Sequence, residues 1–438
     1  MYGSAAVIVI TQLPRLSRIL RPAAPFLALW GVYAGVATAG AFLVGNETSL
    51  PNGSLLAGFE NALLPLATIT VTFWNTLLPR MELLRVVSWT LAVVMSMNAI
   101  VALWTCYAGL DAAPFLPRFW TAAGSDVTVA LLAEQMGRFS GIFNQPAEAG
   151  VAYSLAAFCL LYLIRTGVRM PIALQTLMWT LIILDGLLTI SKIFVIGGVV
   201  VATIQLLTDR DNRLRLALSG LATLVAAGAA GVLDLAGSWG ASIMLNVYRV
   251  SVRAGDSPLY TLSAGRFGSP GDSGGPPSMG APTVSGATDV IAPPSTELAA
   301  ISDQVLAHHP WFGVGAKGLV VSYDSAWTEA LVVAGVVGVV VLVAVHAALV
   351  LSWFGRRKEL PRAEWILCGA VVVLVLGSSF GLPSLTGNRE STLLWIFVGL
   401  MLFTASSQSP GPSRAEPVRK GYLMPESSDV RSTARAGD

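Results

Sequence analysis

The sequence predicts an all-α polytopic membrane protein with about ten transmembrane helices and a large external loop late in the chain. Three observations carry this prediction. Of the 438 residues, 54% are hydrophobic and only 12% are charged, whereas a soluble domain carries roughly 25% charged residues. The mean hydropathy is +0.68. The apolar residues also gather in stretches long enough to cross roughly 30 Å of hydrocarbon.

Each candidate span is a mostly apolar stretch of roughly 20 residues, the length that a membrane-crossing helix requires. A very tight turn joins the fifth and sixth of them. The candidates cover residues 24–45, 55–78, 84–105, 147–164, 172–190, 191–207, 215–236, 326–354, 364–382 and 391–407.

The distribution of Lys and Arg orients these spans. If the chain begins in the cytoplasm and the spans alternate, 19 of the 27 basic residues fall on segments inside. Both termini are therefore expected in the cytoplasm. Topology leaves eight basic residues on external segments unexplained, and we expect several of them to share a function. These eight are Arg118, Arg138, Lys192, Arg249, Arg253, Arg266, Lys317 and Arg389.

Four regions follow from this reading. Residues 1–236 form an N-terminal membrane bundle with an external loop at 106–146. Residues 237–325 form the large external loop. Its Gly-, Pro- and Ser-rich part, 268–295, is predicted to be a flexible insertion because it cannot bury enough apolar surface. Residues 326–407 supply the last membrane helices, and 408–438 a disordered cytoplasmic tail. The three cysteines have no paired spacing, so neither a disulfide framework nor a metal site is expected.

The end of the large loop holds the most distinctive residues of the chain. Residues 296–309 have apolar positions at helical spacing, and Pro310 is expected to end that helix. His308 and His309 then lie on its last turn, near the negative end of the helix dipole, which favours a protonated imidazole. The glycines that follow permit the close approach of a ligand, and Trp311 suits a sugar ring or the membrane interface. The alternative is a re-entrant turn packed into the bilayer surface.

Other external cations are candidate anion-binding groups. Arg138 opens a Gly- and Pro-containing turn just before the fourth span, and Lys192 lies in the tight turn between the fifth and sixth. An ordinary surface turn and a lysine that reaches the headgroups are the alternatives. A pair between Asp185 and Lys192, about two helical turns apart, is a further interpretation of this turn.

Taken together, these motifs resemble the superfamily of O-antigen ligases and O-antigen polymerases. An Arg-x-x-Gly-x-Phe-x-x-Pro element occupies residues 138–146, a loose Ser-Gly-Arg match lies at 264–266, and His-Pro-x-x-Gly-Val-Gly occupies 309–315. A Gly-x-x-Gly element follows at 335–338. The chain departs from the family at 324–325, where Asp-Ser stands in place of a His-Asn pair.

This resemblance implies a fold like that of the glycosyltransferase C class, a place in the bacterial inner membrane, and glycan transfer on the external face of that membrane. The donor would be a glycan on undecaprenyl diphosphate, with membrane lipid, a flippase and a chain-length regulator as partners, no cofactor or metal and no nucleic acid. Arg and Lys stabilise the leaving diphosphate, and a His base activates the acceptor hydroxyl. The resemblance assigns His309, Arg138 and Arg266 to catalysis and Lys192, Lys317 and Arg389 to the diphosphate. His308, Trp311, Gly313 and Gly315 have secondary roles.

Polymerases and ligases differ in their acceptor, which is another lipid-linked repeat unit or a lipid A core. The departure at residues 324–325 favours a polymerase of a secreted or surface polysaccharide. A transporter and a non-catalytic assembly scaffold are the alternatives from other classes. Few charges lie in the middle of the predicted spans, which argues against transport, and a scaffold leaves the external cations unexplained.

Overall fold

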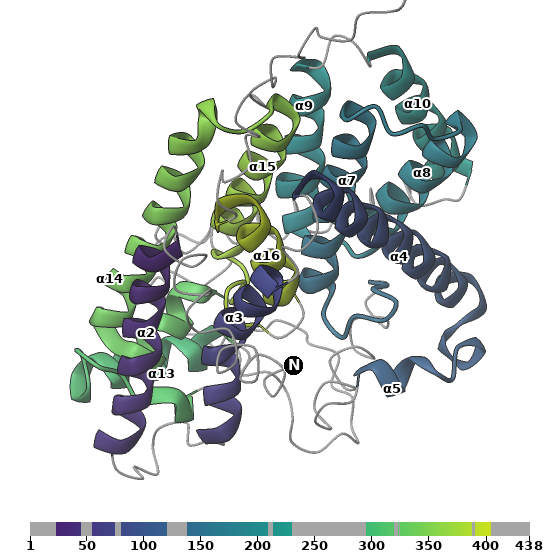
Figure 1. Ribbon diagram of the computed structural model, residues 1–438. Coiled ribbons are helices and arrows are strands. Elements are labelled where there is room, and N and C mark those ends of the chain that lie inside the picture. Colours follow the sequence, from purple (N-terminus) through teal and green to yellow (C-terminus); the bar gives the residue numbers. More distant parts are fainter. Residues whose placement is uncertain are drawn as a thin grey trace, which may run out of the picture. The chain divides into compact units, whose positions relative to one another are not determined.

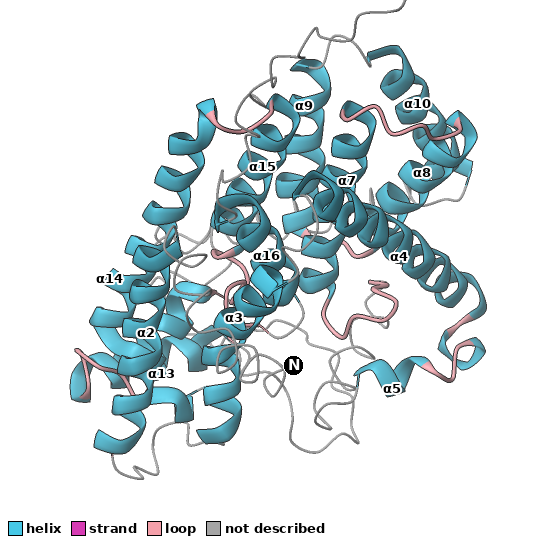
Figure 2. Ribbon diagram, viewed as in Figure 1, coloured by secondary structure: helices cyan, strands magenta, loops and turns pink. Residues whose placement is uncertain are grey.

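The computed structural model describes residues 23–44, 55–74, 80–120, 138–208, 213–229, 295–318, 323, 325–387 and 390–403. All of them belong to the first of two compact units of the chain, Met1–Thr404. In this part of the chain every regular element is helical and no strand occurs (Figures 1 and 2). The predicted all-α class is therefore confirmed. The flexible insertion, the tail and most of the large external loop lie outside the described residues.

Helices occupy each of the apolar stretches that the sequence singled out. In the N-terminal part these are α2 (Ala24–Leu43), α3 (Leu55–Trp74), α4 (Arg80–Ala108), α7 (Pro146–Arg165), α8 (Ile172–Leu188), the π-helix η3 (Ile193–Val200) continued by α9 (Val201–Thr208), and α10 (Arg213–Ala229). Two short helices, η2 (Leu110–Ala112) and α5 (Leu116–Trp120), follow α4.

The C-terminal part begins with α13, Ser295–His308, followed by a single 3-10 turn, η4, Gly315–Gly318. The remaining elements are α14 (Ala326–Gly355), η5 (Arg356–Lys358), α15 (Arg362–Ser378), α16 (Glu390–Val398) and the π-helix η6 (Gly399–Phe403). The predicted helix at 296–309 is thus present, and it ends before Pro310 as expected.

Four of the described helices are long and apolar enough to cross a membrane. They are Ala24–Leu43, Met81–Ala108, Pro146–Arg165 and Ala326–Lys358. Ile172–Leu188, Ile193–Gln205 and Glu390–Met401 are shorter apolar helices. An α-helical membrane protein is therefore supported, and the full count of ten spans stays a prediction.

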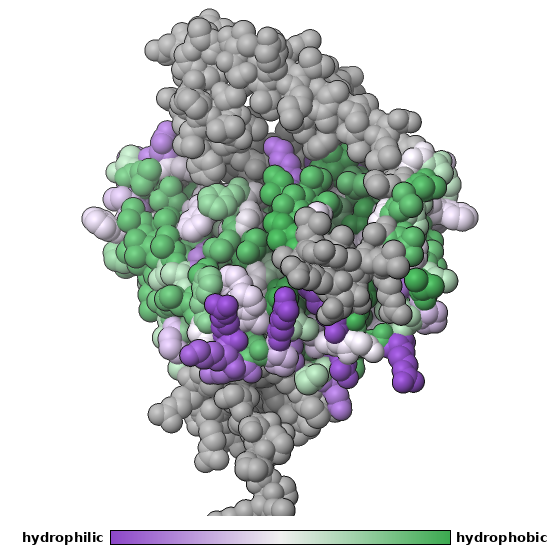
Figure 3. Space-filling model, turned by 90° about the horizontal axis from the view of Figure 1, so that it is seen from above, coloured by the Kyte–Doolittle hydropathy of each residue, from purple (hydrophilic) through white to green (hydrophobic). Residues whose placement is uncertain are grey.

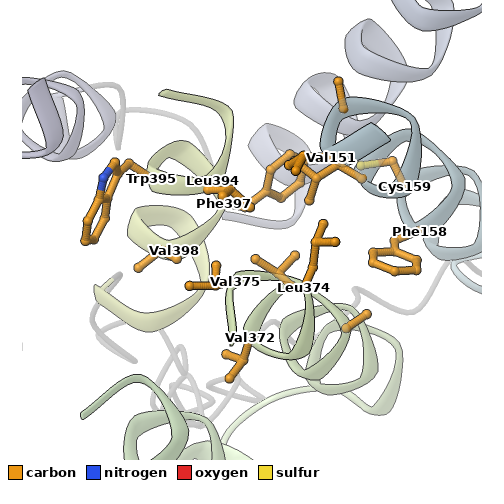
Figure 4. Close-up of a cluster of buried hydrophobic side chains, with 14 of the residues drawn as sticks. Val151, Phe158, Cys159, Val372, Leu374, Val375, Leu394, Trp395, Phe397 and Val398 are labelled. Carbon is orange, nitrogen blue, oxygen red and sulfur yellow. The ribbon is translucent and has the colours of Figure 1, made fainter. Parts of the chain in front are cut away.

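Helix α7 lies at the centre of the packing, because its side chains from Ala149 to Leu163 are almost completely buried. Val151 and Phe158 of α7 meet side chains of α15 and α16 in one hydrophobic cluster (Figure 4). By contrast, α2, α4 and α14 carry large apolar side chains exposed on their outer faces, such as Met97 and Val340. Hydrophobic side chains cover much of the face shown in Figure 3, and hydrophilic ones gather near its lower border. This distribution fits a lipid-facing surface.

Small residues bring α7, α8 and η3 into close contact. A Cβ on Gly198 would lie 2.6 Å from Ser154 Oγ, and a Cβ on Gly186 would collide with the ring of Phe194. Close approach through glycine and serine is the usual way in which helices associate in a membrane. The tight turn predicted between the fifth and sixth spans is present at residues 189–191, directly after α8.

Candidate functional site

The first part of the candidate site is the arginine loop, which we define as residues 138–145. It lies against the end of α8, where the backbone N–H of Phe139 donates to the Leu188 carbonyl at 3.1 Å. Arg138 Nε donates to the Thr189 carbonyl at 3.3 Å. Burial lowers the pKa of the Arg138 guanidinium, yet arginine stays protonated in proteins. The loop therefore places a half-buried positive charge beside the turn after α8.

Lys192 lies on the same turn as the partners of Arg138. It immediately precedes the π-helix η3, and its side chain is exposed. Ser191, its neighbour, is buried against Gly150 near the start of α7. The structure thus brings the segments that carry Arg138 and Lys192 together, although they are far apart in the sequence.

The second part is the glycine segment, which we define as residues 309–318. It is inserted into a break in α14 at Gly335, whose φ is +63°. The Val336 N–H donates to the Pro310 carbonyl at 2.8 Å and the Val337 N–H donates to that of Trp311 at 3.2 Å. The Val314 N–H in turn donates to the Val332 carbonyl at 2.8 Å. The break therefore leaves polar backbone groups that the glycine segment satisfies.

The glycine segment also packs closely against α2 and α3, through glycines on both sides of the contact. Gly315, with φ +75°, lies so close to α2 that a Cβ would collide with the backbone of Ala41. A Cβ on Gly40 would lie 2.9 Å from the Phe312 carbonyl oxygen, and one on Gly58 of α3 would collide with Ala316. The structure explains Gly313 and Gly315 by close backbone packing against the protein's own helices, as in the re-entrant alternative. Close approach of a ligand at these glycines stays a prediction.

The two histidines differ in exposure. His308 ends α13 and is exposed, whereas His309 is half-buried and its Nε2 atom is inaccessible to solvent.

The other predicted site residues differ in exposure too. Lys317 is half-buried within η4. The Trp311 side chain is 63% exposed, which leaves it available to the membrane interface or to a sugar ring. These residues are held by α2, α3, α13 and α14, whereas Arg138 is held by α8. Arg266 and Arg389, the other predicted site residues, lie outside the described part of the chain.

A buried polar chain connecting α4, α7 and α8 was missed by sequence reasoning. Asn98 Nδ2 donates to the Tyr153 hydroxyl at 2.7 Å, and that hydroxyl donates to Asp185 Oδ2. Asp185 is completely buried, and Lys192 is exposed. Asp185 points into the bundle, where the Tyr153 hydroxyl satisfies one of its oxygens, and the suggested pair of Asp185 with Lys192 stays a prediction.

Further buried acids occur at helix ends. Glu329, in the first turn of α14, accepts from the hydroxyl of Thr386 in the turn before α16. Glu148 and Glu390, in the first turns of α7 and α16, are also buried. The sequence did contain a signal for these acids. Each one lies at the end of a predicted span, and in each case it is the end that we expect on the external side of the membrane. No group of three or more His, Cys, Asp or Glu residues suited to a metal ion occurs among the described residues.

His346, in the middle of α14, has a hydrogen-bond partner at each ring nitrogen. Its Nδ1 lies 2.8 Å from the Leu342 carbonyl oxygen and its Nε2 lies 2.9 Å from Ser379 Oγ. The Trp327 ring stacks on it with a centroid separation of 5.1 Å. These contacts join α14 to the end of α15.

The chain was compared with protein-family models, with curated proteins and with solved structures, and none of them matches.

Proposed function

We propose that the chain is a metal-independent membrane glycosyltransferase that polymerises lipid-linked oligosaccharide units into a surface or secreted polysaccharide. The single observation that supports this best is the arginine loop, which sets a half-buried Arg138 against the turn that carries Lys192. Two cations at the end of an apolar bundle suit a lipid whose diphosphate lies at the membrane surface. The proposal places this end on the external face of a bacterial inner membrane, with ten spans and both termini in the cytoplasm.

In the proposed reaction, an acceptor sugar hydroxyl attacks the anomeric carbon of a glycan carried on undecaprenyl diphosphate. The bond from that carbon to the phosphate oxygen breaks, and the lipid diphosphate leaves with the electron pair. His309 takes the proton of the attacking hydroxyl, for which an imidazole is suited near neutral pH. Arg138, Arg266 and Lys192 stabilise the charge that grows on the diphosphate, with Lys317 and Arg389 in supporting roles.

The products of a strain that lacks the gene test this function. With a polymerase, the long polymer disappears while single repeat units are still made, and the wild-type gene restores the polymer. Restoration should fail with an Arg138→Ala variant at equal protein level. Uncapped lipid A core together with free polymer on its carrier would instead indicate a ligase. An unchanged glycan surface with altered uptake of a solute would reject glycan transfer in favour of a transporter.

A further inference from the structure

The buried side chain of Asn98, on α4, forms hydrogen bonds with the backbone of the arginine loop. The Ile142 N–H donates to Asn98 Oδ1 at 2.8 Å, and Asn98 Nδ2 donates to the Ser140 carbonyl at 3.2 Å. The residue between them, Gly141, has a φ of +60°, and a Cβ there would collide with the Asn98 amide. The asparagine therefore binds the loop backbone in the way that a neighbouring strand would, and glycine is required at the point of contact.

A second helix, and a side chain of the loop itself, also hold the arginine loop. Trp120 Nε1, at the end of α5, donates to the Gly141 carbonyl at 3.0 Å. Ser140 Oγ donates to the Phe143 carbonyl at 2.8 Å. Asn98, Trp120 and Ser140 are all buried. The turn that follows Arg138 is thus defined by hydrogen bonds from three buried side chains.

The orientation of Asn98 depends in turn on Tyr153 and Asp185. The Tyr153 hydroxyl accepts from Asn98 Nδ2 and donates to Asp185 Oδ2, so it fixes the amide with Nδ2 toward Tyr153 and the Ser140 carbonyl and Oδ1 toward the Ile142 N–H. The Asp185 carbonyl accepts from the Thr189 N–H at 2.9 Å. Thr189 is also the residue whose carbonyl receives Arg138 Nε. One chain of contacts therefore runs from the loop through α4 and α7 to the turn that holds Arg138.

We propose that Asn98, Tyr153 and Asp185 are positioning residues that hold the arginine loop so that Arg138 faces the donor diphosphate. Their role rests on the proposed function, and none of the three is expected to touch the substrate. A network that only stabilised the fold would not need to contact the backbone on both sides of Gly141. Because hydrogen bonds in such a chain strengthen one another and fix one geometry, the loss of one member should release the loop while the surrounding helices remain packed.

The central experiment compares Tyr153→Phe with Tyr162→Phe. Both tyrosines are buried on α7, but Tyr162 lies more than two turns further from the loop. Hydrogen exchange of the purified proteins reports on the loop without any assay of activity. In Tyr153→Phe the amides of the peptide containing residues 139–144 should exchange about tenfold faster, as expected for the loss of a buried hydrogen bond. In Tyr162→Phe that peptide should exchange at the wild-type rate. Equal exchange in both variants and the wild type would overturn the positioning role.

The link to Arg138 is tested by a double-mutant cycle on glycan transfer. Tyr153→Phe should lower kcat/KM about 10-fold or more in the wild type but much less in an Arg138→Lys background, because both changes disturb the same contact with the diphosphate. A full and additive loss in that background would show that the tyrosine acts elsewhere. If the wild-type protein transfers no glycan, the proposed function fails, and the exchange measurement still decides whether the network holds the loop.

A conservative substitution separates geometry from folding. Asp185→Asn keeps an oxygen that can accept from the Tyr153 hydroxyl, so it should retain the slow exchange of the loop. If Tyr153→Phe does not accumulate in the membrane, Asn98→Ala provides the second measurement. It removes the contacts to Ser140 and Ile142 directly, and unchanged exchange of the loop in that variant would contradict the proposal.

Discussion

The arginine loop is anchored largely by side chains, whereas the glycine segment is anchored by backbone groups. Asn98 and Trp120 donate to or accept from the arginine loop, and removal of such a side chain should loosen it. The glycine segment exchanges backbone hydrogen bonds with α14 around Gly335 and lies directly on α2, so the addition of a single methyl group should disrupt it. The comparison teaches that removal of a side chain should loosen the arginine loop far more than the glycine segment, although both contain a glycine, such as Gly141 and Gly315, that leaves no room for a methyl group.

The largest effect is expected from Gly315→Ala. Alanine at a φ of +75° costs about 1–2 kcal/mol, and its Cβ would push Ala41 and the rest of α2 away from residue 315, which costs about 1–3 kcal/mol more. We expect a lower melting temperature of the purified protein and much less of it in the membrane. Gly167→Ala is the matched control, because its φ is +69° but no atom lies near the new Cβ. Equal losses in both variants would show that backbone strain alone, and not contact with α2, is responsible.

His309→Ala should impair the chemistry rather than the fold. Loss of a general base typically costs about 10²–10⁴-fold in rate. The backbone hydrogen bonds of His309 to Val305 and Gly313 remain in the variant, and the melting temperature measures any change in folding separately from the rate. His308→Ala, at the exposed neighbour, should have a milder effect. The rates of transfer at equal expression decide between them, and a dead His308 variant with an active His309 variant would show that the wrong base was chosen.

Arg138→Lys is expected to have an intermediate effect. Lysine keeps the charge but loses the planar fork that binds a diphosphate with two nitrogens, so the rate should fall about 10–100-fold. Arg118→Lys serves as the control, because Arg118 is an exposed arginine on the same loop, residues 106–146, that was predicted to lie outside. Should both variants transfer glycan at the wild-type rate, charge alone would suffice at position 138, and the arginine loop would not need its defined geometry.

The smallest effect is expected from deletion of residues 270–292, which belong to neither anchored segment. Their composition argues against a packed role, so most transfer activity and a normal protein level should remain. The amount and length of the polymer made by a complemented deletion strain provide the measurement. Complete loss of polymer at a normal protein level would mean that this stretch binds the acceptor.

Local sequence patterns determined the helices themselves. The length of each apolar stretch predicted a helix close to where one is found, and Pro310 marked the end of α13. The short turn after α8 was also recognisable from the chain. These features depend on the hydrophobic effect and on proline geometry, which act on residues adjacent in the sequence.

Only the tertiary structure decided what the polar residues contact. Hydropathy says that Asn98, Tyr153 and Asp185 lie in or near apolar stretches, but not that they meet, because their partners are 32 to 55 residues away. Likewise, the glycines at 313, 315 and 335 indicate freedom of the backbone, while only the packed structure shows that α2 and the break in α14 fill that space. The sequence indicates which side chains can be buried. A polar group that is buried away from water must form a hydrogen bond within the protein, and its partner depends on how the helices are arranged.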